Sequence, residues 1–100
     1  MGKASPRWFE VTIPYDSRAT LRESFIQDCL RMAHECGVKT DGVMFDEGDA
    51  HDRVLLPPEV ARAYFFHPFR SAIADWLLVT GMARPCPAEP DQASLKPLSN

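Results

Sequence analysis

One long amphipathic helix constrains the fold of this chain more than any other feature. Between residues 20 and 36 apolar side chains recur every three or four positions, which predicts a helix of about 17 residues with one apolar stripe. Its opposite side is polar and solvated, so a second layer must cover the stripe. Gly37 is a natural left-handed end for the helix. The stripe consists of Leu21, Phe25, Cys29, Met32, Ala33 and Cys36.

Strand patterns on both sides of the helix supply that second layer. Residues 8–13 alternate, with Phe9, Val11 and Ile13 on one face, and Pro14 closes the run. Residues 38–46 and 53–57 are short β-favouring runs on either side of an acidic stretch. We therefore expect an antiparallel hairpin whose tip is Glu47 to Asp52.

The C-terminal third predicts two short helices and a tail. Pro57 and Pro58 suit a helix start, so residues 59–66 form a first helix, and a second runs from Pro68 to about Thr80. From residue 82 onward four prolines fall among small and polar residues without periodicity. The expected organisation is a single compact domain over residues 1–81 and a proline-rich extended or disordered tail over residues 82–100.

The order of the expected elements, β-α-β-β-α-α, predicts an α+β fold. We expect a small two-layer sandwich in which a three-stranded antiparallel or mixed sheet packs against helices.

Charge and composition exclude several classes of function. The 100 residues include 14 acidic and 11 basic side chains, a net charge of −3, so the positive excess that nucleic-acid binding needs is missing. No apolar run reaches the roughly 18 residues of a membrane span, and the N-terminus lacks the apolar segment of a signal peptide. We expect a cytoplasmic protein that binds neither nucleic acid nor membrane. An odd number of cysteines, three, fits reduced thiols there.

The acidic stretch before Arg53 has the residue types of a metal site. Its spacing does not fit an EF-hand, because Gly48 falls third in the loop rather than sixth. A solvated hairpin tip explains the composition equally well, so no cofactor is expected. The alternative is a small metal-dependent enzyme or metal-binding module whose ligands are Asp46, Asp49, His51 and Asp52.

Nucleophilic catalysis finds little support in the sequence. Cys29 and Cys36 lie on the apolar stripe, where a thiol packs as a small hydrophobic group. Cys86 is expected to be exposed in the tail, His34 to be solvated, and His67 to cap or link the late helices. Because no phosphate loop or hydrolase motif is present, we expect a protein without catalytic machinery.

The aromatic mass of the late helices is large for one small core. This favours an accessory or interaction protein that contacts another protein, with a homodimer as the simplest case. Two alternatives stay open: these residues form only core, or the cleft between sheet and helices holds a small apolar ligand. The expected interface anchors are Tyr64, Phe66, Phe69 and Trp76.

Overall fold

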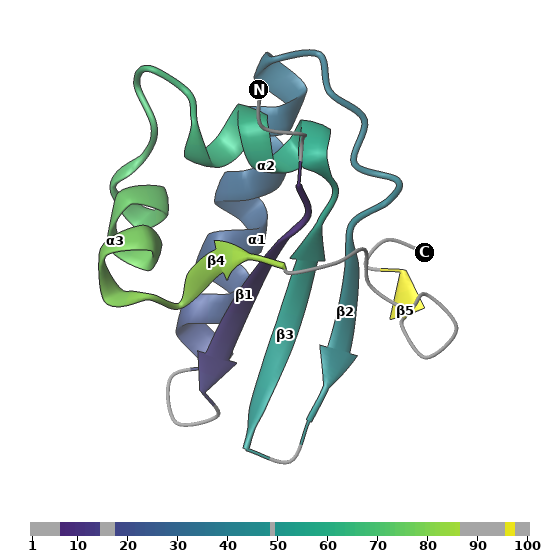
Figure 1. The fold of residues 1–100 in the computed structure, drawn as a ribbon, viewed down its shortest axis with the longest axis vertical. Coiled ribbons are helices and arrows are strands. Elements are labelled where there is room, and N and C mark those ends of the chain that lie inside the picture. Colours follow the sequence, from purple (N-terminus) through teal and green to yellow (C-terminus); the bar gives the residue numbers. More distant parts are fainter. Residues whose placement is uncertain (1–6, 15–17, 49, 87–95, 98–100) are drawn as a thin grey trace, which may run out of the picture.

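A computed structural model of the chain describes residues 7–14, 18–48, 50–86 and 96–97 (Figure 1). The first six elements follow the predicted order, β-α-β-β-α-α, and two further strands come after them. The elements are β1 (Phe9–Pro14), α1 (Arg18–Glu35), β2 (Met44–Glu47), β3 (His51–Leu56), α2 (Pro58–Phe65), α3 (Ala72–Thr80), β4 (Ala83–Pro85) and β5 (Lys96–Pro97).

The strands form one sheet in the order β4-β1-β3-β2-β5, and all neighbouring strands are antiparallel. β1 pairs with β3 along its full length, from Phe9 opposite Leu56 to Pro14 opposite His51. β2 and β3 form the expected hairpin, whose last paired residues are Glu47 and Asp52.

The helices lie on one face of this sheet, which confirms the α+β class and the two-layer arrangement. Figure 1 shows α1 behind the sheet, α2 across its upper end and α3 beside β4. Since side chains alternate along a strand, one face supplies the core and the other faces away from the helices. The buried core includes Val11, Ile13, Val54 and Leu56 from the strands, Phe25, Cys29 and Met32 from α1, and Tyr64, Phe65, Ala74 and Leu77 from α2 and α3.

The sheet is wider than expected, and the start of the predicted tail belongs to the domain. Residues 83–85 pair with β1, and the amide of Cys86 donates to the carbonyl of Trp8 at 2.8 Å. Pro85 is tolerated because β4 is an edge strand, where a missing N–H disturbs no second partner. The sheet therefore continues past Gly81, and the expected exposure of Cys86 is wrong because its side chain is buried. Residues 87–95 and 98–100 lie outside the described part of the chain.

Most helix ends agree with the sequence to within two residues, and one differs by more. Gly37 and Gly81 have φ angles of 71° and 81°, so both end their helices in the left-handed region. α3, however, begins four residues later than expected, because Ser71 caps it: its Oγ accepts a hydrogen bond from the amide of Ala74 at 3.1 Å. Phe69 therefore lies in a loop rather than in a helix.

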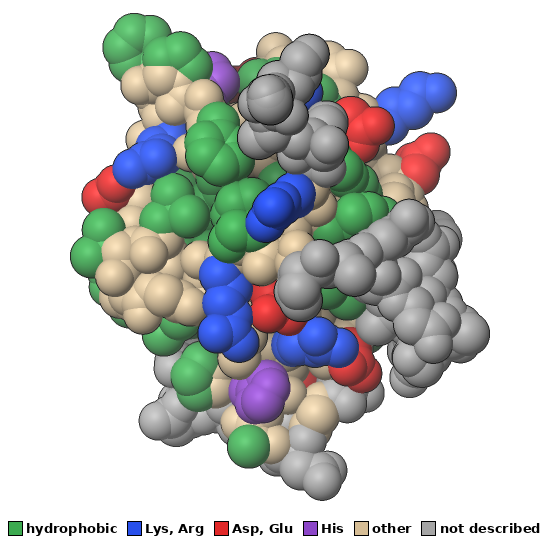
Figure 2. Space-filling model, in the orientation of Figure 1, with side chains coloured by type: hydrophobic (Ala, Val, Ile, Leu, Met, Phe, Trp, Pro, Cys, Tyr) green, Lys and Arg blue, Asp and Glu red, His purple; other side chains and the backbone are tan. Residues whose placement is uncertain are grey.

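The sheet face opposite the helices carries a ladder of ion pairs across four strands. Glu10 on β1 accepts from Arg84 on β4 and from Arg53 on β3, both at 3.1 Å. Arg53 in turn donates to Asp46 on β2 at 3.0 Å. Figure 2 shows blue and red side chains alternating across this face. These cross-strand ion pairs stabilise the pairing of the four strands and balance the acidic and basic side chains on this face of the sheet.

Candidate functional site

The structure separates the four expected interface anchors into one core residue and three surface residues. Tyr64 is fully buried, so it is not available for contact with another molecule. Phe66, Phe69 and Trp76 keep 61%, 85% and 44% of their surface exposed. Val79, which the sequence did not single out, is 77% exposed. We refer to Phe66, Phe69, Trp76 and Val79 as the α2–α3 surface.

The exposure of this surface follows from the composition of α3, which is apolar on both sides. Ala74 and Leu77 face the core and are fully buried. Trp76 and Val79, three residues apart, lie on the outer side of the helix. Figure 2 shows hydrophobic side chains over the region of α2, α3 and the loop between them, with blue and red side chains among them. The spacing of Val79 from Trp76 is the signal that could have identified it in the sequence.

A polar cluster around Asp28 of α1 joins the three helices. The hydroxyl of Tyr64 donates to Asp28 Oδ2 at 2.7 Å, and the hydroxyl of Ser71, at the start of α3, donates to the same oxygen. Arg31 donates to Asp28 Oδ1 at 2.8 Å. One carboxylate therefore accepts hydrogen bonds from α1, from α2 and from the cap of α3, and so positions the helix that carries half of the α2–α3 surface.

The protonation of this cluster is fixed by its contacts. Burial acts to raise the pKa of Asp28, but the hydrogen bonds from Ser71, Tyr64 and Arg31 outweigh it and bring the pKa below its usual value. Burial, together with the hydrogen bond to the charged Asp28, raises the pKa of Tyr64. Asp28 is therefore an acceptor and Tyr64 a donor at neutral pH, and neither is poised to transfer a proton.

The structure does not bring the expected metal ligands together. Asp46 and Asp52 lie on opposite faces of the hairpin, where Asp46 binds Arg53 and the buried Asp52 binds Arg22 of α1 at 3.2 Å. His51 is exposed in β3, opposite Pro14. Asp49 lies outside the described residues. Within the described ranges no three histidine, cysteine or acidic side chains form a group that could hold a metal ion.

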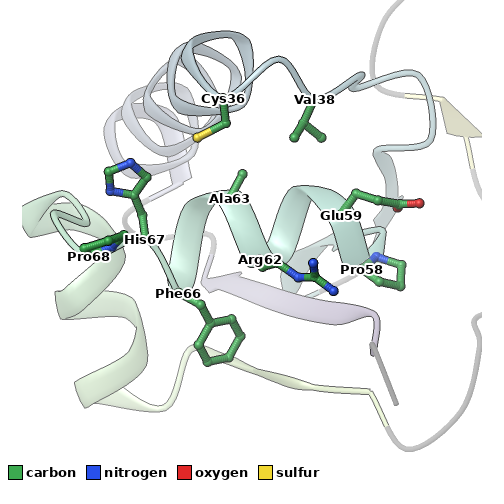
Figure 3. Close-up of a pocket in the computed structure, with 9 residues that line it drawn as sticks. All are labelled: Cys36, Val38, Pro58, Glu59, Arg62, Ala63, Phe66, His67 and Pro68. Atoms are coloured by element: carbon green, nitrogen blue, oxygen red, sulfur yellow. The ribbon is translucent and has the colours of Figure 1, made fainter. Parts of the chain in front are cut away.

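A groove of about 670 Å³ opens between the C-terminal end of α1 and α2 (Figure 3). Figure 3 shows Cys36 and Val38 on one side and the side chains of α2 on the other. We refer to this hollow as the α1–α2 groove. Its walls combine apolar residues with one thiol, one imidazole and one residue of each charge. The lining residues are Cys36, Val38, Pro58, Glu59, Arg62, Ala63, Phe66, His67 and Pro68.

The thiol and the imidazole of this groove are not arranged as a nucleophile and its base. The amide of Phe69 donates to His67 Nδ1 at 2.9 Å, so the proton of the neutral ring is on Nε2. With one nitrogen accepting this bond and the other protonated, the ring has no free lone pair to take the proton of Cys36. His67 lies in the loop between α2 and α3 and caps neither helix, because Phe66 ends α2 and Ser71 caps α3; of its two expected roles only the linking one agrees with the structure.

The three cysteines differ in accessibility, and this gives a direct test. Burial and the negative charge of Asp28 raise the pKa of Cys29 to about 12, and burial also raises the pKa of Cys86. Cys36 is exposed, contrary to its expected place in the core, because it follows the end of α1. Since thiolates react and buried thiols do not, a maleimide at neutral pH is expected to label one cysteine of the native protein and three after unfolding. Intact mass measurement and peptide mapping should place the native label on Cys36; a native label on Cys29 would contradict the packing of α1.

Comparisons with known proteins do not add to this geometry. No protein-family model, no curated protein and no solved structure matches the chain. In the described residues no helix has the length and apolar character needed to cross a membrane.

Proposed function

We propose that this protein acts by protein–protein contact and that the α2–α3 surface joins two copies into a homodimer. The observation that carries the proposal is the exposure of Phe66, Phe69, Trp76 and Val79 within fourteen residues of the sequence. Single exposed apolar residues are ordinary, but a concentration of large ones on one side of a small domain is typical of an interface.

Most of the core forms without these side chains, and of the four only Phe66 has a ring contact with a core residue, Phe9, at a centroid distance of 5.6 Å within the described residues. The sheet, α1 and the inner sides of α2 and α3 already form a continuous buried cluster that includes Phe25, Tyr64 and Phe65. Aromatic residues dominate contact energies at interfaces because they bury large areas with few rotatable bonds. A second copy is the simplest partner, since it presents the same apolar surface and two-fold dimers are the commonest soluble assembly.

The test is the dependence of molar mass on protein concentration, measured by sedimentation equilibrium. The wild-type protein is expected to pass from monomer to dimer as the concentration rises. Trp76→Lys combined with Val79→Lys should keep it monomeric, because both changes place charge in the contact while suiting the C-terminal half of a helix.

The matched control is Leu30→Lys, which introduces the same side chain at an exposed apolar position of α1, outside the α2–α3 surface. This variant is expected to dimerise like the wild type. A protein that stays monomeric at every concentration would overturn the proposal, as would equal weakening by the Leu30 and α3 substitutions.

A further inference from the structure

The loop between α2 and α3 presents Phe69 as a fixed projection. Its ring centroid lies 6.2 Å from that of His67, and its amide donates to the same imidazole. On the other side, Arg70 donates to the carbonyl of Phe65 at 3.1 Å and to Asp75 at 2.8 Å. Arg70 therefore ties one flank of Phe69 to α2 and α3, and His67 braces the other flank within the loop. The ring of Phe69 remains 85% exposed although its backbone is held, which is the arrangement of a preorganised contact residue.

The hollow that matches this projection lies beside it on the same molecule. His67 and Pro68, which directly precede Phe69, both line the α1–α2 groove. The groove has apolar surface from Val38, Ala63 and Phe66, and its volume accommodates an aromatic side chain together with part of its loop. Phe69 does not enter the groove of its own chain, since its ring is almost wholly exposed.

Because Phe69 and the α1–α2 groove lie next to each other on one molecule, a two-fold axis can place the Phe69 of each copy in the groove of the other copy. In such a contact each residue meets its counterpart reciprocally, so both projections are buried by one operation. We propose, on the basis of the proposed dimer, that each copy inserts Phe69 into the α1–α2 groove of the other. The groove is then completed only by the second copy.

The charges of the groove are compatible with this arrangement. Glu59 and Arg62 lie one turn apart on α2 and both line the groove. Within the described part of the chain neither forms an ion pair. A two-fold axis across the groove can set the acid of one copy opposite the guanidinium of the other, which favours pairing over like-charge contact.

The reactivity of Cys36 reports directly on the groove. Because Cys36 lines the groove and is the exposed thiol, insertion of Phe69 from the second copy should shield it from a maleimide. The labelling rate is expected to fall about tenfold once roughly nine-tenths of the copies are paired, since only unpaired copies expose the thiol. In Phe69→Ala the rate should stay at its dilute value at all concentrations.

A disulfide trap tests the same contact without relying on shielding. Phe69→Cys places a thiol where it enters the groove, and copper-catalysed air oxidation should then link it to Cys36 of the second copy as a covalent dimer. The link should disappear when Phe69→Cys is combined with Cys36→Ser. Val79→Cys, on the α2–α3 surface but outside the groove lining, should not link to Cys36.

The outcomes separate this inference from the proposal on which it rests. A wild-type protein that never dimerises overturns both. If it dimerises through α3 while Cys36 keeps its dilute labelling rate and Phe69→Cys forms no link to Cys36, the dimer stands and the exchange of Phe69 is overturned. Concentration-dependent protection that Phe69→Ala removes, together with the specific disulfide, supports the exchange.

Discussion

Replacing Phe65 with alanine is expected to lower the free energy of unfolding by about 3–5 kcal/mol, the largest effect of any single side-chain truncation considered for this protein. Phe65 is fully buried. Its ring stacks on that of Phe9 with the ring centroids 5.2 Å apart, and it makes an edge contact with Tyr64 with the centroids 4.9 Å apart. Truncation removes this buried area and leaves a cavity between the sheet and α2. For a domain of this size the midpoint of thermal unfolding should fall by roughly 12 °C or more.

The matched control is Phe69→Ala, four residues further along the chain. Its ring is exposed, so its loss should change the free energy of unfolding by no more than about 0.5 kcal/mol in the monomer. Both variants are compared by chemical denaturation at a concentration low enough to keep the protein monomeric. Equal losses would contradict the burial of Phe65 and the exposure of Phe69.

These two phenylalanines show how far the sequence could predict the aromatic segment. Its excess of apolar residues correctly indicated that some of them lie outside the core. The direction of each side chain could not be predicted, because α2 has only eight residues and is apolar on most sides. Its orientation depends on a tertiary contact, the hydrogen bond from Tyr64 to Asp28, which links positions far apart in sequence. Tyr64 was therefore expected at the surface and lies in the core.

The long helix was predictable because its pattern repeats over several turns. The prediction placed the start two residues late, since α1 begins at Arg18, and at the other end it assigned Cys36 to the apolar stripe. α1 ends at Glu35 and Gly37 turns the chain through a left-handed conformation, so periodicity no longer determines where Cys36 points. Because Cys36 lines the α1–α2 groove, this error hid one of the groove's lining residues. The groove itself could not be predicted from any local sequence pattern.

Two further differences from the sequence predictions, the added strand β4 and the separation of the acidic residues of the hairpin, have the same explanation. β4 has only three residues, one of them a proline, which is too short for an alternating strand pattern to be recognised in the sequence. It forms a strand because it pairs with the edge of β1. Asp46 and Asp52 were grouped because they are close in sequence. Strand alternation sends them to opposite faces, where Arg53 and Arg22 bind them. Partners distant in the chain decided each case.

Replacing Asp28 with alanine is expected to lower the free energy of unfolding by about 1–3 kcal/mol, because the buried hydroxyl of Tyr64 loses its acceptor. The cap of α3 loses a contact as well, since Ser71 donates to the same carboxylate. Denaturant titration measures the change, and Tyr64→Phe serves as the matched partner. In a double-mutant cycle the cost of Tyr64→Phe should shrink when Asp28 is already alanine; simple additivity would contradict the described hydrogen bond.

The contribution of Asp28 should also depend on pH, with a sign set by its lowered pKa. A carboxyl group whose pKa is lower in the folded than in the unfolded state stabilises the fold above its unfolded value, near about 4, and this stabilisation is lost as the pH falls through the folded value. Below about pH 4 the wild type is therefore expected to lose stability faster than Asp28→Ala, so the gap between them narrows. Denaturant titrations from neutral to acid pH measure this gap. A gap that stays constant through the acid range would mean that Asp28 is not held as a carboxylate by Ser71, Tyr64 and Arg31, and that α3 is positioned by its apolar contacts alone.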